Sequence, residues 1–86
     1  MTEIEVKDYI QGLLDEGAED SHVESVFFSK EAPTVFGVWI GGYVTLTILE
    51  DISLKFGDDD LWIYSRDGKT KITVNTFPKT LEEFKI

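Results

Sequence analysis

The sequence contains no cysteine, only one histidine and two prolines, and no long apolar run. Without cysteine the core has to hold without disulfide bonds, and this usage fits a reducing cytosol. No apolar stretch approaches the ~18 residues of a membrane span, and no positively charged segment followed by an apolar run opens the chain. We therefore expect a soluble, cytoplasmic protein with no membrane partner.

Motifs for catalysis and cofactor binding are also missing. The single His22 has no cysteine or second histidine with which to form a metal site or a catalytic triad. Gly41-Gly42 is not followed by Gly-Lys-Ser/Thr, so it is no phosphate loop. The acidic run at 57–60 lacks the spacing of a calcium loop, which favours a charged turn. We expect a protein that is not an enzyme and binds no metal and no cofactor.

The acidic charge is concentrated in the first part of the chain. The protein has 86 residues, 42% of them hydrophobic, and a formal net charge of −9. Residues 1–60 hold fourteen acidic and three basic residues, a net charge of −11, whereas residues 61–86 hold five bases and three acids, a net charge of +2. The length and the hydrophobic content predict one folded domain over 1–86, with a single modest core.

The chain opens with a strong helix signal. Thr2 and Glu5 have the spacing of a capping box, in which each side chain binds the other residue's backbone amide. Apolar residues then recur at helical spacing, and Gly17 can supply a left-handed residue after the last turn. These signals predict a helix from about residue 3 to residue 16. Its apolar face is formed by Val6, Tyr9, Ile10, Leu13 and Leu14.

The segment 61–74 has the pattern of a β-hairpin. Two alternating runs flank Asp67-Gly68, a pair favoured in two-residue type I′ turns. This turn sets Tyr64 opposite Lys71 and Trp62 opposite Thr73. One face then carries the apolar residues Leu61, Ile63, Ile72 and Val74, and the other carries Trp62, Tyr64, Arg66, Lys69 and Lys71.

The segments between the helix and the hairpin favour further strands. Residues 22–29 are strand-like, with an irregularity near 26–28. For 35–49 we favour a hairpin turned at Gly41-Gly42 over one long bent strand. The alternation beyond it predicts a three-residue loop at 49–51, a strand at 52–56 and a turn at 57–60. A second capping-box pattern predicts a short C-terminal helical turn within 80–86.

Together these elements predict an α+β fold. An N-terminal amphipathic helix packs on an antiparallel β-meander of four to five strands, followed by the short C-terminal helical turn. A small barrel with a flanking helix is the alternative.

Charge and exposure suggest the function. Carboxylates on a rigid fold can imitate nucleic acid by occupying a cleft built for phosphates. We expect a small acidic protein that binds and inhibits a protein with a basic surface, such as one that handles nucleic acid. In size and acidity the chain resembles phage-encoded anti-defence proteins and bacterial toxin-immunity proteins, although no motif is shared. The candidate contact residues are Asp8, Asp15, Glu16, Glu19, Asp20, Asp58, Asp59, Asp60, Trp62 and Tyr64.

Other interpretations of the aromatic hairpin face remain open. It can bind nucleic acid or a peptide, although the overall charge makes direct nucleic-acid binding unfavourable unless the acids lie on the far side. Its residues can instead stabilise one another across the strands, or be covered by Phe77, Leu81 and Phe84. A structural component that pairs through exposed strand edges is a further possibility, so both a monomer and a homodimer are compatible with the sequence.

Overall fold

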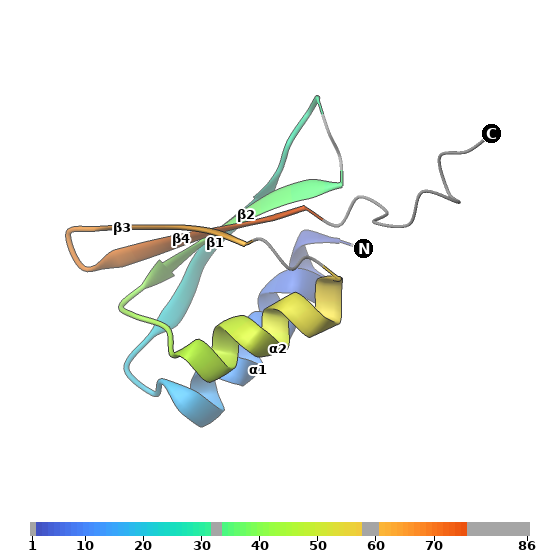
Figure 1. Ribbon diagram of the computed structural model, residues 1–86. Helices are drawn as coiled ribbons and strands as arrows, with labels where there is room; N and C mark the ends of the chain where they lie inside the picture. Colours follow the sequence, from blue (N-terminus) through green and yellow to red (C-terminus); the bar gives the residue numbers. More distant parts are fainter. Residues whose placement is uncertain (1, 32–33, 58–60, 76–86) are drawn as a thin grey trace.

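The computed structural model describes residues 2–31, 34–57 and 61–75. Two helices and four strands follow one another along these residues (Figure 1). They are α1 (Glu3–Gly17), β1 (His22–Phe28), β2 (Val35–Gly41), α2 (Leu46–Phe56), β3 (Trp62–Arg66) and β4 (Lys69–Asn75).

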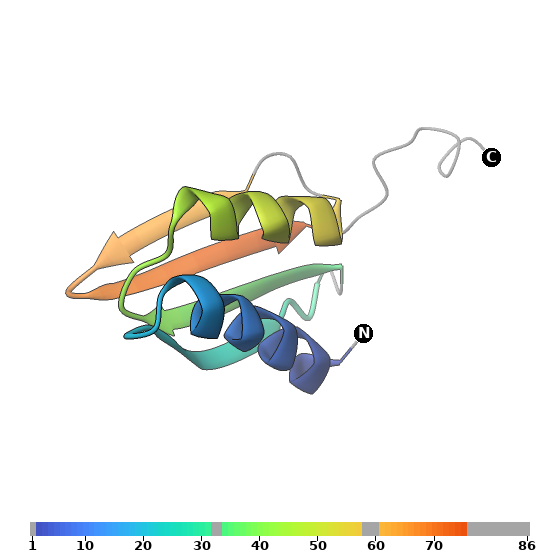
Figure 2. The ribbon, with the colours of Figure 1, turned by 90° about the horizontal axis from the view of Figure 1, so that it is seen from below.

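The four strands form one antiparallel sheet with the order β1-β2-β4-β3. Both helices lie on the same face of this sheet, as the views in Figure 1 and Figure 2 agree. The opposite face carries no helix among the described residues. The predicted α+β fold, with an N-terminal helix packed on an antiparallel sheet, is confirmed.

Helix α1 begins as predicted. The Thr2 hydroxyl accepts a hydrogen bond from the Glu5 amide at 3.2 Å, and the Glu5 carboxylate accepts one from the Thr2 amide at 2.7 Å. The predicted role of Gly17 is wrong, because Gly17 is the last helical residue and is not left-handed. Ala18 caps the end of the helix, and its amide donates to the Leu14 carbonyl at 2.7 Å.

The prediction for the middle of the chain is wrong beyond Gly41. Residues 35–41 form strand β2, but Gly41-Gly42 turns no hairpin, and neither the strand expected at 43–49 nor the one expected at 52–56 exists. The loop expected at 49–51 lies inside helix α2.

Local signals for α2 are present in the sequence. The Thr45 hydroxyl caps the helix by accepting from the Ile48 amide at 3.2 Å, and Gly57 ends it in the left-handed conformation with φ of 70°. Ile48 and Ile52, four residues apart, are its buried residues. Where every second residue is apolar, residues four positions apart are apolar as well. The alternating pattern of this segment therefore fits a helix as well as a strand.

The hairpin formed by β3 and β4 has the predicted turn and register. Asp67 and Gly68 have φ of 52° and 76°, as a type I′ turn requires. Tyr64 lies opposite Lys71 and Trp62 opposite Thr73. The irregularity expected in β1 is also present, but it falls between Val23 and Ser25 rather than at 26–28.

The core lies between the sheet and the two helices. Helix α1 contributes Val6, Ile10 and Leu14, and α2 contributes Ile48 and Ile52. Phe56 joins the layers, since its ring centroid lies 5.8 Å from that of Tyr9 on α1 and 5.0 Å from that of Phe36 on β2. The sheet contributes Val23, Phe36, Val38, Ile40, Ile72 and Val74.

Some predictions fall outside the described residues. These are the turn with Asp58, Asp59 and Asp60, the C-terminal helical turn within 80–86, and the cover formed by Phe77, Leu81 and Phe84. In the part of the chain that the structure describes, neither helix combines the length and apolar character needed to cross a membrane.

Candidate functional site

The two layers of the molecule differ in charge. The two helices and the turn between α1 and β1 hold nine acidic and two basic residues, a net charge of −7. The four strands and the turn at Asp67-Gly68 hold two acidic and three basic residues, a net charge of +1. The excess acid therefore lies on the helix side of the sheet.

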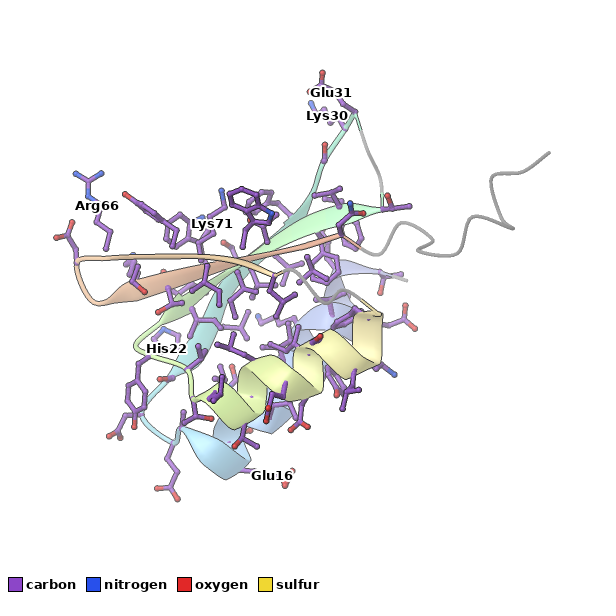
Figure 3. All side chains as sticks on the ribbon, viewed as in Figure 1. Glu16, His22, Lys30, Glu31, Arg66 and Lys71 are labelled. Carbon is purple, nitrogen blue, oxygen red and sulfur yellow. The ribbon has the colours of Figure 1, made fainter. Side chains whose placement is uncertain are left out.

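The candidate contact residues lie on two opposite sides of the molecule. Figure 3 shows Glu16 at the outer side of the helices, whereas Arg66 and Lys71 point away from the helices on the other side of the sheet. The five described acidic candidates are all exposed on α1 and the turn after it, and they are Asp8, Asp15, Glu16, Glu19 and Asp20. Trp62 and Tyr64 belong to the helix-free side, because they pair with Thr73 and Lys71 and alternate with the core-facing positions of β4.

The helix-free side of the sheet carries a cluster that we call the aromatic face. Trp39, Lys71 and Tyr64 lie side by side on β2, β4 and β3. The Trp39 and Tyr64 ring centroids are 6.5 Å apart in an edge-to-face arrangement. Trp62 is 76% exposed beside them. The aromatic face consists of Phe27, Trp39, Trp62, Tyr64 and Lys71.

Gly37 gives the Phe27 ring its place on this face. A Cβ atom at Gly37 would lie only 2.4 Å from the Phe27 Cζ, so the ring covers the bare backbone of β2. Lys71 reaches toward the same area, with its Nζ 5.3 Å from the Phe27 ring centroid and 5.8 Å from the Trp39 centroid. The ammonium group therefore lies within cation–π distance of two aromatic rings.

The basic residues of the sheet differ in their partners. Lys69 Nζ lies 3.0 Å from the Glu24 carboxylate, and Arg66 Nε lies 3.4 Å from the Asp67 carboxylate. Among the described residues, no carboxylate forms an ion pair with Lys71. The aromatic face thus holds one positive charge whose partners are aromatic rings.

A hollow of about 440 Å³ opens on the aromatic face. Thr73 forms its floor. This residue pairs with Gly37 on β2 and with Trp62 on β3, and the small side chains of Thr and Gly leave space below the level of the aromatic rings. A hollow of this size with aromatic walls can accept a planar ring. Its lining is formed by Trp39, Trp62, Ile63, Tyr64, Lys71 and Thr73.

A second surface, which we call the leucine groove, lies between α2 and the edge strand β3. It has a volume of about 640 Å³. Leu46 is 73% exposed, Leu54 is 83% exposed and Ile63 is 47% exposed, so large apolar side chains lie open to solvent. The groove is lined by Leu46, Leu49, Glu50, Asp51, Ser53, Leu54, Leu61 and Ile63.

The phase of α2 explains the exposed leucines. Ile48 and Ile52 occupy the buried stripe, which turns the stripe of Leu46, Glu50 and Leu54 outward at intervals of four residues. The Glu50 carboxylate therefore lies between the exposed side chains of Leu46 and Leu54 in the leucine groove.

Within the described residues, the pKa is shifted for Tyr9 and Glu5, and neither side chain lines the hollow or the leucine groove. Burial raises the pKa of Tyr9, and the Asp51 carboxylate adds to the shift. Hydrogen bonds from the Thr2 backbone and hydroxyl lower the pKa of the exposed Glu5. Over residues 2–31, 34–57 and 61–75, no three His, Asp or Glu side chains gather where they could hold a metal ion.

Trp39 and the leucine groove were not predicted as parts of a site. Trp39 lies in a strand that is apolar on both faces, so alternation did not assign it to a side. Leu46 and Leu54 lie in segments that the sequence predicts as strands, and only the helix turns them outward. The signal that could have found them is Thr45 before and Gly57 after an eleven-residue segment, a cap pair typical of a helix.

No known protein family, curated protein or solved structure matches this chain.

Proposed function

We propose that this protein is a small non-enzymatic binding protein that docks on and inhibits another protein with a basic surface, such as one that handles nucleic acid. The observation that carries the proposal is the leucine groove, in which exposed leucines flank a carboxylate on the layer with a net charge of −7.

The charge of the helix layer favours a basic partner over a distance. Nine carboxylates against two lysines create a negative field on one side of the molecule. Such a field accelerates the association of a positively charged surface, and salt weakens it. Asp8, Asp15, Glu16, Glu19 and Asp20 act in this step without each needing a fixed contact.

The leucine groove supplies the contact once the partner is near. Burying a leucine that was exposed contributes on the order of 1.5–3 kcal/mol, so Leu46 and Leu54 together can anchor an apolar segment. Glu50 lies between them and can pair with a lysine or arginine of that segment. The partner surface we expect is apolar with a basic residue at its centre.

Inhibition follows from the chemistry of such a partner. A protein that handles nucleic acid presents lysines and arginines spaced for phosphates. The carboxylates of the helix layer can occupy the same positions, and the leucine groove fixes them there, so the nucleic acid is excluded.

The experiment compares variants with equal charge changes at different places. The immobilised protein captures partners from a lysate, a salt gradient elutes them and mass spectrometry identifies them. Glu50→Lys and Glu16→Lys both reverse one exposed carboxylate of the helix layer, but only Glu50 lies in the leucine groove. Leu54→Ala tests the apolar anchor. We expect one basic protein to be captured by the wild type and by Glu16→Lys, and lost with Glu50→Lys and Leu54→Ala.

Activity of the captured protein tests the inhibition. Addition of the wild type should suppress nucleic-acid binding or turnover by that protein, and Leu54→Ala should not. Equal capture by all variants, or capture of acidic proteins only, would contradict the proposal. A mass in solution that rises with concentration for the wild type but not for Leu54→Ala would also contradict it, because the leucine groove would then join two copies of the chain.

A further inference from the structure

We propose that the aromatic face is a separate binding site for single-stranded nucleic acid. Bases stack on Trp62 and Tyr64, and a phosphate lies beside the ammonium group of Lys71. This inference does not rest on the function proposed above, because it uses the opposite side of the sheet.

The aromatic side chains are spaced for successive bases. Trp62 and Tyr64 are two residues apart on the same side of β3, which separates them by about 7 Å along the strand. Both are exposed, with Trp62 the more open of the two. Neighbouring bases of an extended single strand can each meet one of these rings, since stacking requires only a planar face and tolerates any sequence.

The hollow beside these rings offers a place for a further base. Its floor at Thr73 lies lower than its aromatic walls, Trp39 and Trp62. A base that enters from the strand edge would meet an aromatic ring on either side and a hydroxyl group at the floor. A peptide segment also fits an aromatic hollow, but the charge of this face argues for a ligand with anionic groups.

Lys71 is the group on this face that most needs an anion. Lys69 and Arg66 have Glu24 and Asp67 as carboxylate partners, whereas Lys71 contacts the Phe27 and Trp39 rings. A phosphate of a bound strand would supply the missing negative charge next to the stacked bases. Because a single lysine is available for this contact, the affinity should depend only weakly on salt. The logarithm of the binding constant should fall with the logarithm of the salt concentration with a slope of about 0.7, the value for one phosphate contact; we call this the salt slope.

The net charge of the protein does not prevent this binding. The excess acid is on the outer side of the helices, so a helix diameter of about 10 Å and the sheet itself separate it from a ligand on the aromatic face. At physiological salt the Debye length is about 8 Å, so most of the repulsion is screened. From the overall charge, direct nucleic-acid binding is expected to be unfavourable unless the acidic residues lie on the far side of the molecule, and most of them do.

The protein contains its own reporter for this site. It has two tryptophans, Trp39 and Trp62, and both line the hollow. The experiment titrates the full chain with an oligothymidylate of about ten nucleotides at moderate salt and follows tryptophan fluorescence. Stacked bases should quench the emission in a saturable manner.

Matched variants locate the binding. Tyr64→Ala should weaken the affinity at least about fivefold, which is the lower end for loss of one stacked base. Tyr43→Ala removes another exposed aromatic, in the connection between β2 and α2, and should leave the affinity unchanged. Lys71→Gln should lower the salt slope by about 0.7, and Lys69→Gln, which removes the same charge from an ion pair, should not. The lysine pair keeps the test decisive if Tyr64→Ala fails to fold.

Several outcomes would overturn the inference. One is fluorescence that does not change with the oligonucleotide. Another is an equal loss of affinity in Tyr43→Ala and Tyr64→Ala, or in the two lysine variants. Saturable quenching by a peptide of glutamate and phenylalanine, without quenching by the oligonucleotide, would assign the aromatic face to acidic peptides instead.

Discussion

Replacement of Ser21 by alanine tests how the chain is held where it leaves β2 for α2. Ser21 is buried, with only 2% of its surface exposed. Its hydroxyl donates to the Tyr43 carbonyl at 2.7 Å and accepts from the Tyr43 amide at 3.0 Å. One hydroxyl thus satisfies both backbone groups of a residue in the segment before α2, and alanine leaves both without that partner.

The size of the effect follows from these two hydrogen bonds. A buried polar group that loses its partner costs about 1–3 kcal/mol. The side chain of Tyr43 is exposed, so water can reach part of this segment, and we expect the lower end for each group. Ser21→Ala should therefore reduce the free energy of unfolding by about 2 kcal/mol. In a domain of this size that corresponds to a fall in Tm of roughly 8–16 °C.

Urea and thermal unfolding followed by circular dichroism measure this change. Ser25→Ala is the matched control, because Ser25 is exposed on β1, and its free energy of unfolding should stay within about 0.5 kcal/mol of the wild type. A Ser21→Ala protein that unfolds with the wild-type Tm would refute the argument that Ser21 anchors the start of α2.

Two further predictions concern the helices. In urea titrations, Ile52→Ala should lower the free energy of unfolding by about 2–5 kcal/mol, because Ile52 is buried. Leu54→Ala should lower it by less than about 0.5 kcal/mol, because Leu54 is exposed. Equal losses would contradict the orientation of α2, in which Ile52 faces the core and Leu54 faces solvent. Because folding lowers the pKa of Glu5, its carboxylate stabilises the fold at pH values above the unfolded pKa of 4.5, and this contribution is lost as the pH falls through the lowered pKa. Glu5→Gln should therefore make the Tm less sensitive to acid. A Tm that falls with acid as steeply as in the wild type would contradict this.

The two proposed surfaces can be tested independently. Leu54 and Glu50 face the leucine groove on the helix side, whereas Tyr64 and Lys71 belong to the opposite side of the sheet. A variant of one surface should therefore leave the other intact, and failure of one proposal would not decide the other.

Local chemistry in the sequence determined α1 and the hairpin of β3 and β4. The Thr2–Glu5 capping box and the Asp67-Gly68 turn involve residues that are neighbours in the chain, so their geometry does not depend on the rest of the fold. The same reasoning identified Trp62, Tyr64 and Lys71 as residues of one face, because the register of a two-residue hairpin fixes which side chains stand together.

The tertiary structure decided what periodicity left open. The segment of α2 satisfies the spacing of a strand and of a helix, and only packing of Ile48 and Ile52 on the sheet selects the helix that exposes Leu46 and Leu54. The strand order likewise sets β4 between β2 and β3, which brings Trp39 beside Lys71 although they are distant in the chain. Both surfaces depend on contacts between segments far apart in sequence, and such contacts are selected by burial of the whole core rather than by the preferences of neighbouring residues.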